Sequence, residues 1–202
     1  MKPGGPEPPS DPSVHETAMP DEAQQEAEWV ELARGGNEGA YRRLVELHRD
    51  RAYGLARRML RTDADAEEVA QDAFVRAWRA LPAFRGESRF GTWLHQIVVR
   101  LALDRAETLK RRQHREPGLA PDAEPAVAGP DHEARLRAMR LESMVSELSE
   151  AQRLAVTLYY FEERSVEDVA EILHMPENTV KTHLSRARAA LREAWLKVGG
   201  KP

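Results

Sequence analysis

The chain has 202 residues, of which 41% are apolar, 6% are aromatic and none is cysteine. The lack of cysteine excludes disulfides and thiolate metal sites, and no apolar run approaches the roughly 18–20 residues of a membrane span. The net charge of −4 is unevenly distributed, because residues 34–116 carry eighteen basic and twelve acidic groups, a balance that suits a polyanionic partner.

Proline-rich segments divide the chain. Residues 1–21 hold six prolines among scattered acids and predict a disordered tail. Residues 113–133 hold four more without apolar periodicity and predict an acidic, flexible linker. No stretch shows the alternation of a β-strand, so we expect an all-α protein with two small helical domains, 22–112 and 134–198.

Helical periodicity and capping residues place the elements of the first domain. The third helix is expected to begin at Thr62 or Asp63, where short polar side chains cap backbone N–H groups, and to stop at Pro82. In chain order the expected helices cover approximately residues 22–34, 38–60, 63–81 and 90–112, with a loop at 83–89.

The second domain shows two repeats of a capping pattern. Ser149 with Gln152, and Ser165 with Asp168, each precede an apolar run. A helix around Leu136, Met139 and Val145 is expected before them. The last helix should carry Val180, Leu184, Ala187, Leu191 and Trp195 on one face, with the first four facing inward.

Residues 165–191 have the pattern of a helix-turn-helix, namely a short helix, a tight turn and a longer basic helix. Short hydroxyls, an amide and cations on the outer face of the second helix suit base edges and phosphates in duplex DNA. The alternative is an amphipathic helix with a solvated basic face. The expected contact residues are Asn178, Thr179, Lys181, Thr182, Ser185 and Arg186.

Two further surfaces stand out in the first domain. The run FRGESRFGTW (84–93) interleaves aromatics with arginines, as single-stranded nucleic acid requires, although Phe90 and Trp93 could equally be core residues. The helix 63–81 presents an acidic face, which suggests a basic protein partner or simple solvation. The members of that face are Asp65, Glu68, Gln71, Asp72 and Arg76.

These segments together resemble a known family. DAEEVAQDAFVRAWRAL, followed by FRGESRFGTWLHQIVVRLALD, is similar to region 2 of the extracytoplasmic-function (ECF) class of bacterial sigma factors. LSEAQRLAVTLYYFEERSVEDVAEILHMPENTVKTHLSRARAALR is similar to their region 4. The resemblance covers nearly all of the expected folded chain, with both regions in order.

The resemblance implies a role for each surface. Asp65, Glu68, Gln71 and Asp72 on the acidic face would bind the β′ clamp helices of core RNA polymerase. Region 4 would meet the β flap and read −35 duplex DNA. The −10 element would be melted and captured by Phe84, Arg85, Ser88, Arg89, Phe90, Trp93, His95, Gln96, Val99 and Arg100. An anti-sigma factor is an expected partner. His174 stands where this family usually has glycine.

Other classes of protein fit less well. A LuxR-type regulator could carry the same helix-turn-helix, but residues 22–112 lack the strands and acidic pocket of a receiver domain. No close-spaced histidine pair, P-loop or Gly-x-Ser-x-Gly motif indicates an enzyme, a metal or a cofactor. Without a secretory signal, we expect a cytoplasmic protein that does not insert into the membrane.

Overall fold

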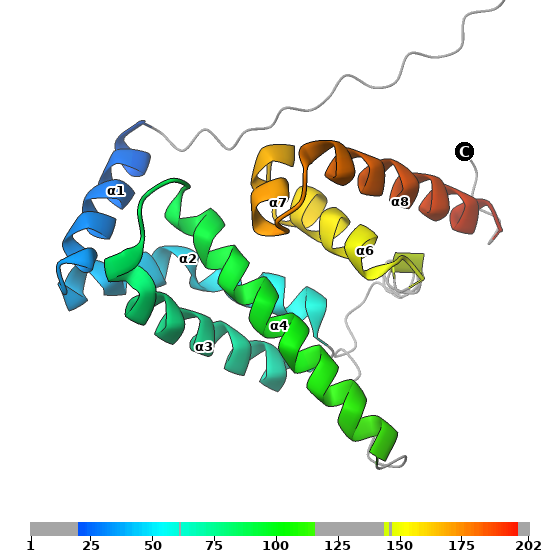
Figure 1. Cartoon of the computed structure of the whole chain (residues 1–202), viewed down its shortest axis with the longest axis horizontal. Helices are drawn as coiled ribbons and strands as arrows, with labels where there is room; N and C mark the ends of the chain where they lie inside the picture. Colours follow the sequence, from blue (N-terminus) through cyan, green and yellow to red (C-terminus); the bar gives the residue numbers. More distant parts are fainter. Residues whose placement is uncertain (1–19, 61, 116–143, 146, 198–202) are drawn as a thin grey trace, which may run out of the picture.

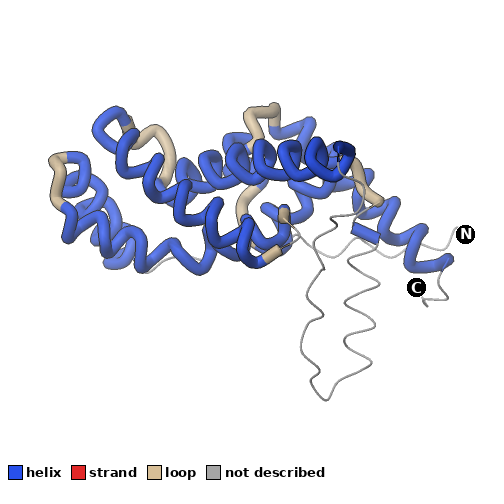
Figure 2. Tube along the Cα trace, turned by 90° about the horizontal axis from the view of Figure 1, so that it is seen from below, coloured by secondary structure: helices blue, strands red, loops and turns tan. Residues whose placement is uncertain are grey.

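The computed structural model describes residues 20–60, 62–115, 144–145 and 147–197. Residues 1–19 and 116–143 lie outside this description, and with them almost all of the predicted tail and linker and the helix expected around Leu136 and Met139. All regular structure in the described ranges is helical, which confirms the predicted class (Figure 2).

The described helices fall into two groups (Figure 1). The N-terminal group contains α1 (Pro20–Arg34), α2 (Glu38–Met59), α3 (Asp63–Ala80), the 3-10 turn η1 (Leu81–Ala83) and α4 (Phe90–Arg115). The C-terminal group contains α6 (Glu150–Val156), the π-helical turn η2 (Thr157–Phe161), α7 (Val166–Ile172) and α8 (Glu177–Lys197).

Capping side chains set the helix boundaries where the sequence predicts them. The Thr62 hydroxyl accepts a hydrogen bond from the Asp65 N–H at 3.1 Å and starts α3. Ser149 and Gln152 form a complete capping box before α6. Ser165 caps α7 through its side chain. These contacts satisfy N–H groups that the first helical turn leaves without partners.

The N-terminal group is a bundle in which α2, α3 and α4 pack against one another and α1 packs on α2. Leu44, Leu55, Leu81, Leu94 and Val98 are completely buried in it. Each such side chain contributes roughly 1.5–3 kcal/mol by leaving water. This bundle fixes the orientations of α3, which carries the predicted polymerase-binding residues, and of α4, which carries part of the predicted −10 surface.

The two groups are also in contact with each other, because α7 packs against α4. One continuous cluster of buried apolar side chains contains Leu94, Val98 and Val99 of α4 together with Val169 and Ile172 of α7. The C-terminal group therefore covers one side of α4 near its N-terminus.

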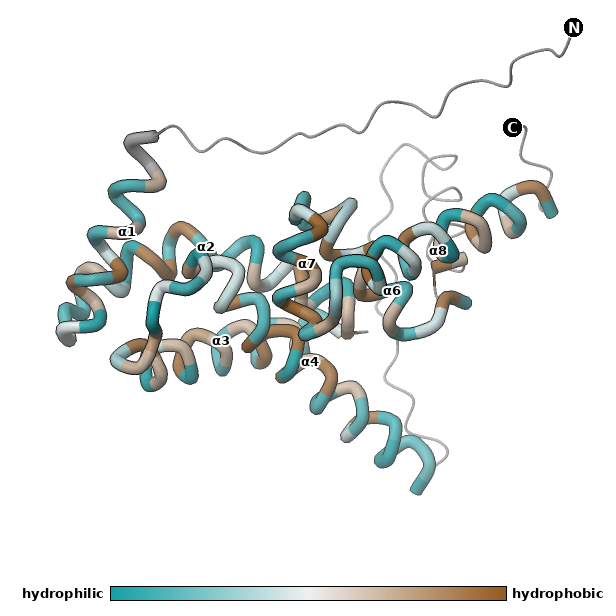
Figure 3. The backbone as a smooth tube through the Cα atoms, turned by 45° about the horizontal axis from the view of Figure 1, so that its top comes forward, coloured by the Kyte–Doolittle hydropathy of each residue, from teal (hydrophilic) through white to brown (hydrophobic). Residues whose placement is uncertain are grey.

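The C-terminal ends of α4 and α8 are largely exposed, and α4 is longer than predicted. The hydrophilic end of α4 projects beyond the bundle and reaches Arg115, past the expected end at Arg112 (Figure 3). An ion pair between Glu107 and Arg111 supports these last turns. At the end of α8, Trp195 shares the apolar face of that helix but is 40% exposed.

Candidate nucleic-acid and protein interfaces

The outer face of α8 brings together the residues predicted to contact duplex DNA. Val180, Leu184 and Ala187 are buried on the opposite face and hold α8 against the rest of the group. A shallow depression on the outer face is lined by Asn178, Lys181, Thr182, Ser185 and Arg186, all exposed. Thr179 is half-buried at the margin of this face.

The turn before α8 sets its angle to α7. His174 adopts φ 51°, the left-handed conformation that the predicted helix-turn-helix requires there. The Met175 N–H donates to the carbonyl of Ala170 at 3.0 Å, and the His174 N–H donates to the carbonyl of Glu171 at 3.2 Å. These hydrogen bonds terminate α7 and direct the chain toward α8.

Polar groups on the α8 face have only weak local partners. Lys181 forms an ion pair with Glu177 at 3.0 Å, and the Thr182 hydroxyl donates to the carbonyl of Asn178 at 2.8 Å. Exposed pairs of this kind contribute about 0–1 kcal/mol. The cations and hydroxyls of the face are therefore available to phosphates and base edges at little cost.

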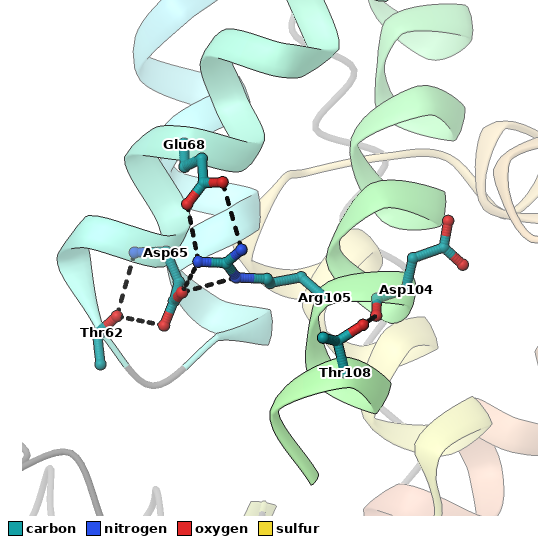
Figure 4. A network of polar contacts seen from close by, with 6 residues as sticks. All are labelled: Thr62, Asp65, Glu68, Asp104, Arg105 and Thr108. Carbon is teal, nitrogen blue, oxygen red and sulfur yellow. Dashed lines mark hydrogen bonds and ion pairs between the residues drawn. The ribbon is translucent and has the colours of Figure 1, made fainter. Parts of the chain in front are cut away.

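The acidic face of α3 is narrower than predicted. Glu68, Gln71 and Asp72 are exposed, whereas Asp65 is only 7% exposed and points toward α4. Figure 4 shows the cause: Arg105 of α4 reaches across to Asp65 and Glu68. The placement of Asp65 on the outer face was thus wrong, because a cation from a neighbouring helix draws that edge of α3 inward.

Asp65 is held as a carboxylate by this network. Its oxygens accept a hydrogen bond from the Thr62 hydroxyl at 2.5 Å and one from Nε of Arg105 at 2.7 Å. Burial by itself raises the pKa of Asp65, but the hydrogen bonds from Thr62 and Arg105 outweigh it and hold the pKa below its usual value. Glu68 shares the same guanidinium at 2.7 Å, so part of its charge is compensated.

The aromatic residues of the loop before α4 pack together. Phe84 and Phe90 are buried, and Trp93 is half-buried with its ring 4.7 Å from that of Phe84. Arg85 and Arg89 are exposed. Phe90 is thus a core residue in this structure, which was one of the two interpretations of the sequence. Phe84 is buried with it, while the arginines of the loop are exposed. Ser88 is half-buried.

The predicted DNA-contacting residues within α4 are mostly covered by α7. His95 and Val99 are buried, Gln96 is half-buried, and Arg100 alone of the four is exposed. Gln96 donates to the Glu171 carboxylate of α7 at 3.2 Å. The expected exposure of His95 and Val99 was wrong for this arrangement, because the C-terminal group packs over them.

Residues without a predicted site role make further polar contacts between the two groups. The Thr92 hydroxyl donates to the Asp168 carboxylate at 2.9 Å, so Asp168 serves α4 as well as the Ser165 cap. Arg58 of α2 pairs at 2.7 Å with Glu162, whose side chain is 4% exposed. The sequence contains the Ser165–Asp168 pattern but no signal for partners 76 or 104 positions apart.

A cavity of about 690 Å³ lies between the groups, beside these contacts. The loop before α4 lines it with Phe84, Arg85 and Trp93, and the turn before α8 lines it with His174 and Pro176. The predicted −10 surface and the helix-turn-helix therefore face each other across this cavity.

Among the described residues, no group of three or more His, Asp or Glu side chains could hold a metal ion. Within the same ranges, none of the helices combines the length and apolar character that crossing a membrane requires. The described helices present a basic face on α8, an acidic face on α3, and an aromatic–arginine loop beside α7.

Comparisons with known proteins agree with this arrangement. Residues 44–113 match the family "Sigma-70 region 2", and residues 138–191 match "Sigma-70, region 4". The RNA polymerase sigma-H factor of Pseudomonas aeruginosa is 34% identical over 181 residues, which cover 85% of this chain and 94% of that protein. The ECF sigma factor SigW of Bacillus subtilis is 29% identical, covering 81% of this chain and 93% of that one.

Solved structures show the same architecture. CnrH, in complex with the cytosolic domain of CnrY, is 26% identical with a TM-score of 0.64, over 86% of this chain and 98% of that one. The sigma factor RpoE of Bartonella quintana, in complex with the anti-sigma factor NepR, is 25% identical with a TM-score of 0.64, over 78% of this chain and 97% of that one.

Proposed function

Because the chain belongs to the ECF class of the sigma-70 family, we propose that it binds core RNA polymerase and directs promoter-specific initiation of transcription. The observation that carries the proposal is the presence of regions 2 and 4 in one chain, each with its binding face in place. A LuxR-type regulator is not favoured, because its helix-turn-helix would not be preceded by region 2.

The acidic face of α3 is the proposed docking site for the β′ clamp helices. Gln71 and Asp72 are exposed there, and Glu68 lies beside them with Arg105 as its partner. Asp65 supports this face from below and does not touch the polymerase. The C-terminal group would bind the β flap while α8 reads the −35 duplex through its basic face.

Capture of the −10 element requires the two groups to separate. In the arrangement described above, α7 packs against α4, and we call this the closed arrangement. The exposed residues Arg85, Arg89 and Arg100 can bind phosphates in it. Bases need the aromatic rings of the loop and the side of α4 that carries His95, Gln96 and Val99, which α7 covers. We therefore place separation of α7 from α4 before promoter melting.

The protein acts by binding and not by catalysis, since the polymerase supplies the chemistry. Of two structural relatives, RpoE is in complex with the anti-sigma factor NepR and CnrH with the cytosolic domain of CnrY. We propose an anti-sigma partner here as well, and a place of action beside the polymerase in the cytoplasm.

Run-off transcription tests the proposal. Purified core RNA polymerase, the chain and a template carrying its candidate promoter should yield a discrete transcript that is absent without the chain. DNA binding without open-complex formation, detected by permanganate footprinting of the −10 region, would contradict the assignment.

The α3 face has its own test. Asp72→Arg should weaken binding to core polymerase by roughly tenfold or more, because a repulsive charge replaces an exposed carboxylate in a basic interface. Affinity is measured by fluorescence anisotropy with labelled chain. Glu46→Arg, a charge reversal on α2, is the matched control and should bind normally; equal losses for both variants would remove the α3 face from the proposal.

A further inference from the structure

The contact between α4 and the C-terminal group has an unusual polar centre. His95 is completely buried, and neither of its ring nitrogens has a hydrogen-bond partner among the described residues. Buried polar groups are almost always partnered in folded proteins, so an imidazole in this state needs a reason.

The groups around His95 come from both sides of the contact. Arg164 of the segment before α7, and His48 and Arg51 of α2, all lower the pKa of His95 through their charges. The approach is close: a Cβ atom on Gly91, one turn before His95, would lie 3.1 Å from the His48 ring and 3.6 Å from Nη2 of Arg164. These close approaches leave little room for a further charged group beside His95.

The carboxylates nearby are engaged with other groups. Asp168 and Glu171 of α7 accept hydrogen bonds from Thr92 and Gln96, which flank His95 on α4. Glu26 of α1 lies 3.0 Å from Nε2 of His48, and Glu162 pairs with Arg58. The charges that act on His95 itself are those of Arg164, His48 and Arg51, so a proton on its ring meets repulsion.

We propose that His95 is a proton-operated latch, so that protonation of its imidazole separates α7 from α4 and uncovers the side of α4 that α7 hides. The latch is a property of the free chain and does not depend on sigma activity. It converts acidification into exposure of Val99, Gln96 and His95 itself.

The direction of the pH effect follows from the pKa of His95 in the closed and the separated forms of the chain. In the closed form, burial lowers the pKa of His95 well below its usual value, and Arg164, His48 and Arg51 add to that shift. In the separated form the ring regains a pKa of about 6.5. The closed form is therefore fully favoured above that pH, and its advantage falls as the pH drops below it. The ratio of separated to closed chain should rise roughly tenfold between pH 7.5 and pH 5.5.

Glu162 works in the opposite direction. Burial raises its pKa above the ordinary 4.5, although Arg58, Arg164 and Arg51 counteract the rise. A carboxyl that binds its proton more tightly in the closed form favours that form as the pH falls. The variant Glu162→Gln removes this contribution and isolates the response of His95.

Single-molecule energy transfer on the full chain tests the latch. The chain has no cysteine, so Ala64→Cys on α3 and Ala189→Cys on α8, both exposed, provide two specific labelling sites. In the Glu162→Gln background, the low-transfer population should rise roughly tenfold, relative to the high-transfer one, from pH 7.5 to pH 5.5. Far-UV circular dichroism should show unchanged helix content.

The histidine variants identify the responsible group. His95→Leu should abolish the pH response, and His95→Gln, a smaller change, should do the same if His95→Leu fails to fold. His114→Gln removes an exposed histidine at the far end of α4 and should respond as the parent does. The proposal is overturned if the labelled Glu162→Gln chain shows no change in energy transfer with pH. It is also overturned if a His95 variant keeps the tenfold change.

Discussion

At the scale of single residues, Asp65 and Asp72 show why equal side chains on one helix have different roles. Both belong to the acidic stripe of α3, but Arg105 reaches only the edge that carries Asp65. Asp65 is therefore part of the packing between α3 and α4, whereas Asp72 is exposed and available to a partner. Periodicity places both residues on the stripe and cannot show where the neighbouring helix begins.

Asp65→Asn should lower the free energy of unfolding by about 2 kcal/mol at pH 7, because a charge-assisted network loses its buried carboxylate. Urea unfolding followed by circular dichroism measures the change. Asp72→Asn is the matched control and should stay within about 0.5 kcal/mol of the parent, as exposed substitutions do.

The effect of Asp65→Asn should also depend on pH. The folded-state pKa of Asp65 lies below its usual 3.8, so its contribution is complete above that pH and is lost as the pH falls through the lowered value. The difference between parent and variant should thus be constant from pH 7 to pH 5 and shrink below pH 4. A difference that grows on acidification would contradict the role given to this carboxylate.

Lys181 offers a residue-scale test of the DNA face. Lys181→Ala should reduce affinity for −35 duplex and lower the slope of log K against log salt by about one unit, since one phosphate contact is lost. Lys197→Ala is matched to it, because Lys197 also pairs with a glutamate one turn earlier but lies at the far end of α8. Equal slopes for the two variants would place the phosphate contacts elsewhere.

At the scale of elements, capping residues determined most helix starts. The hydroxyls of Thr62, Ser149 and Ser165 each accept a backbone N–H at the start of a helix, as their positions predict. Such signals are local, and sequence therefore predicts them well. Periodicity places Trp195 on the apolar face of α8, but its exposure depends on which other segments reach that far.

The turn of the helix-turn-helix carries measurable strain. His174 holds φ 51°, where a side chain costs about 1–2 kcal/mol relative to the right-handed conformation. His174→Gly should relieve part of this cost and raise the free energy of unfolding by about 0.5–1 kcal/mol. His174→Ala keeps the Cβ and should bring no gain. Thermal unfolding compares the two, and equal effects would show that the backbone is not strained here.

At the scale of the whole molecule, the two groups of helices form one continuous core while the α8 face stays open. The closed arrangement can therefore present its duplex-reading helix while the loop and α4 surface are partly covered. Closure is stabilised by apolar contacts between α4 and α7 and by polar links such as Thr92 to Asp168 and Arg58 to Glu162.

Arg58→Ala should loosen this closure. Glu162 is 4% exposed and loses a partner at 2.7 Å, and the Arg58 guanidinium also leaves the ring of Phe161. A loss of about 1–2 kcal/mol would raise the ratio of separated to closed chain roughly five- to thirtyfold at pH 7.5, as read by energy transfer. Arg57→Ala breaks a pair with Asp63 inside the N-terminal group and should leave the ratio unchanged.

By itself, the sequence determined the helical class, most helix starts and the composition of the outer face of α8, because capping and periodicity act within one helix. Only the tertiary structure decided that Asp65 turns inward to Arg105 and that α7 covers His95 and Val99. Those outcomes depend on partners from distant helices. A residue's own helix fixes its direction, but the neighbouring helix decides whether that direction leads to solvent or to another side chain.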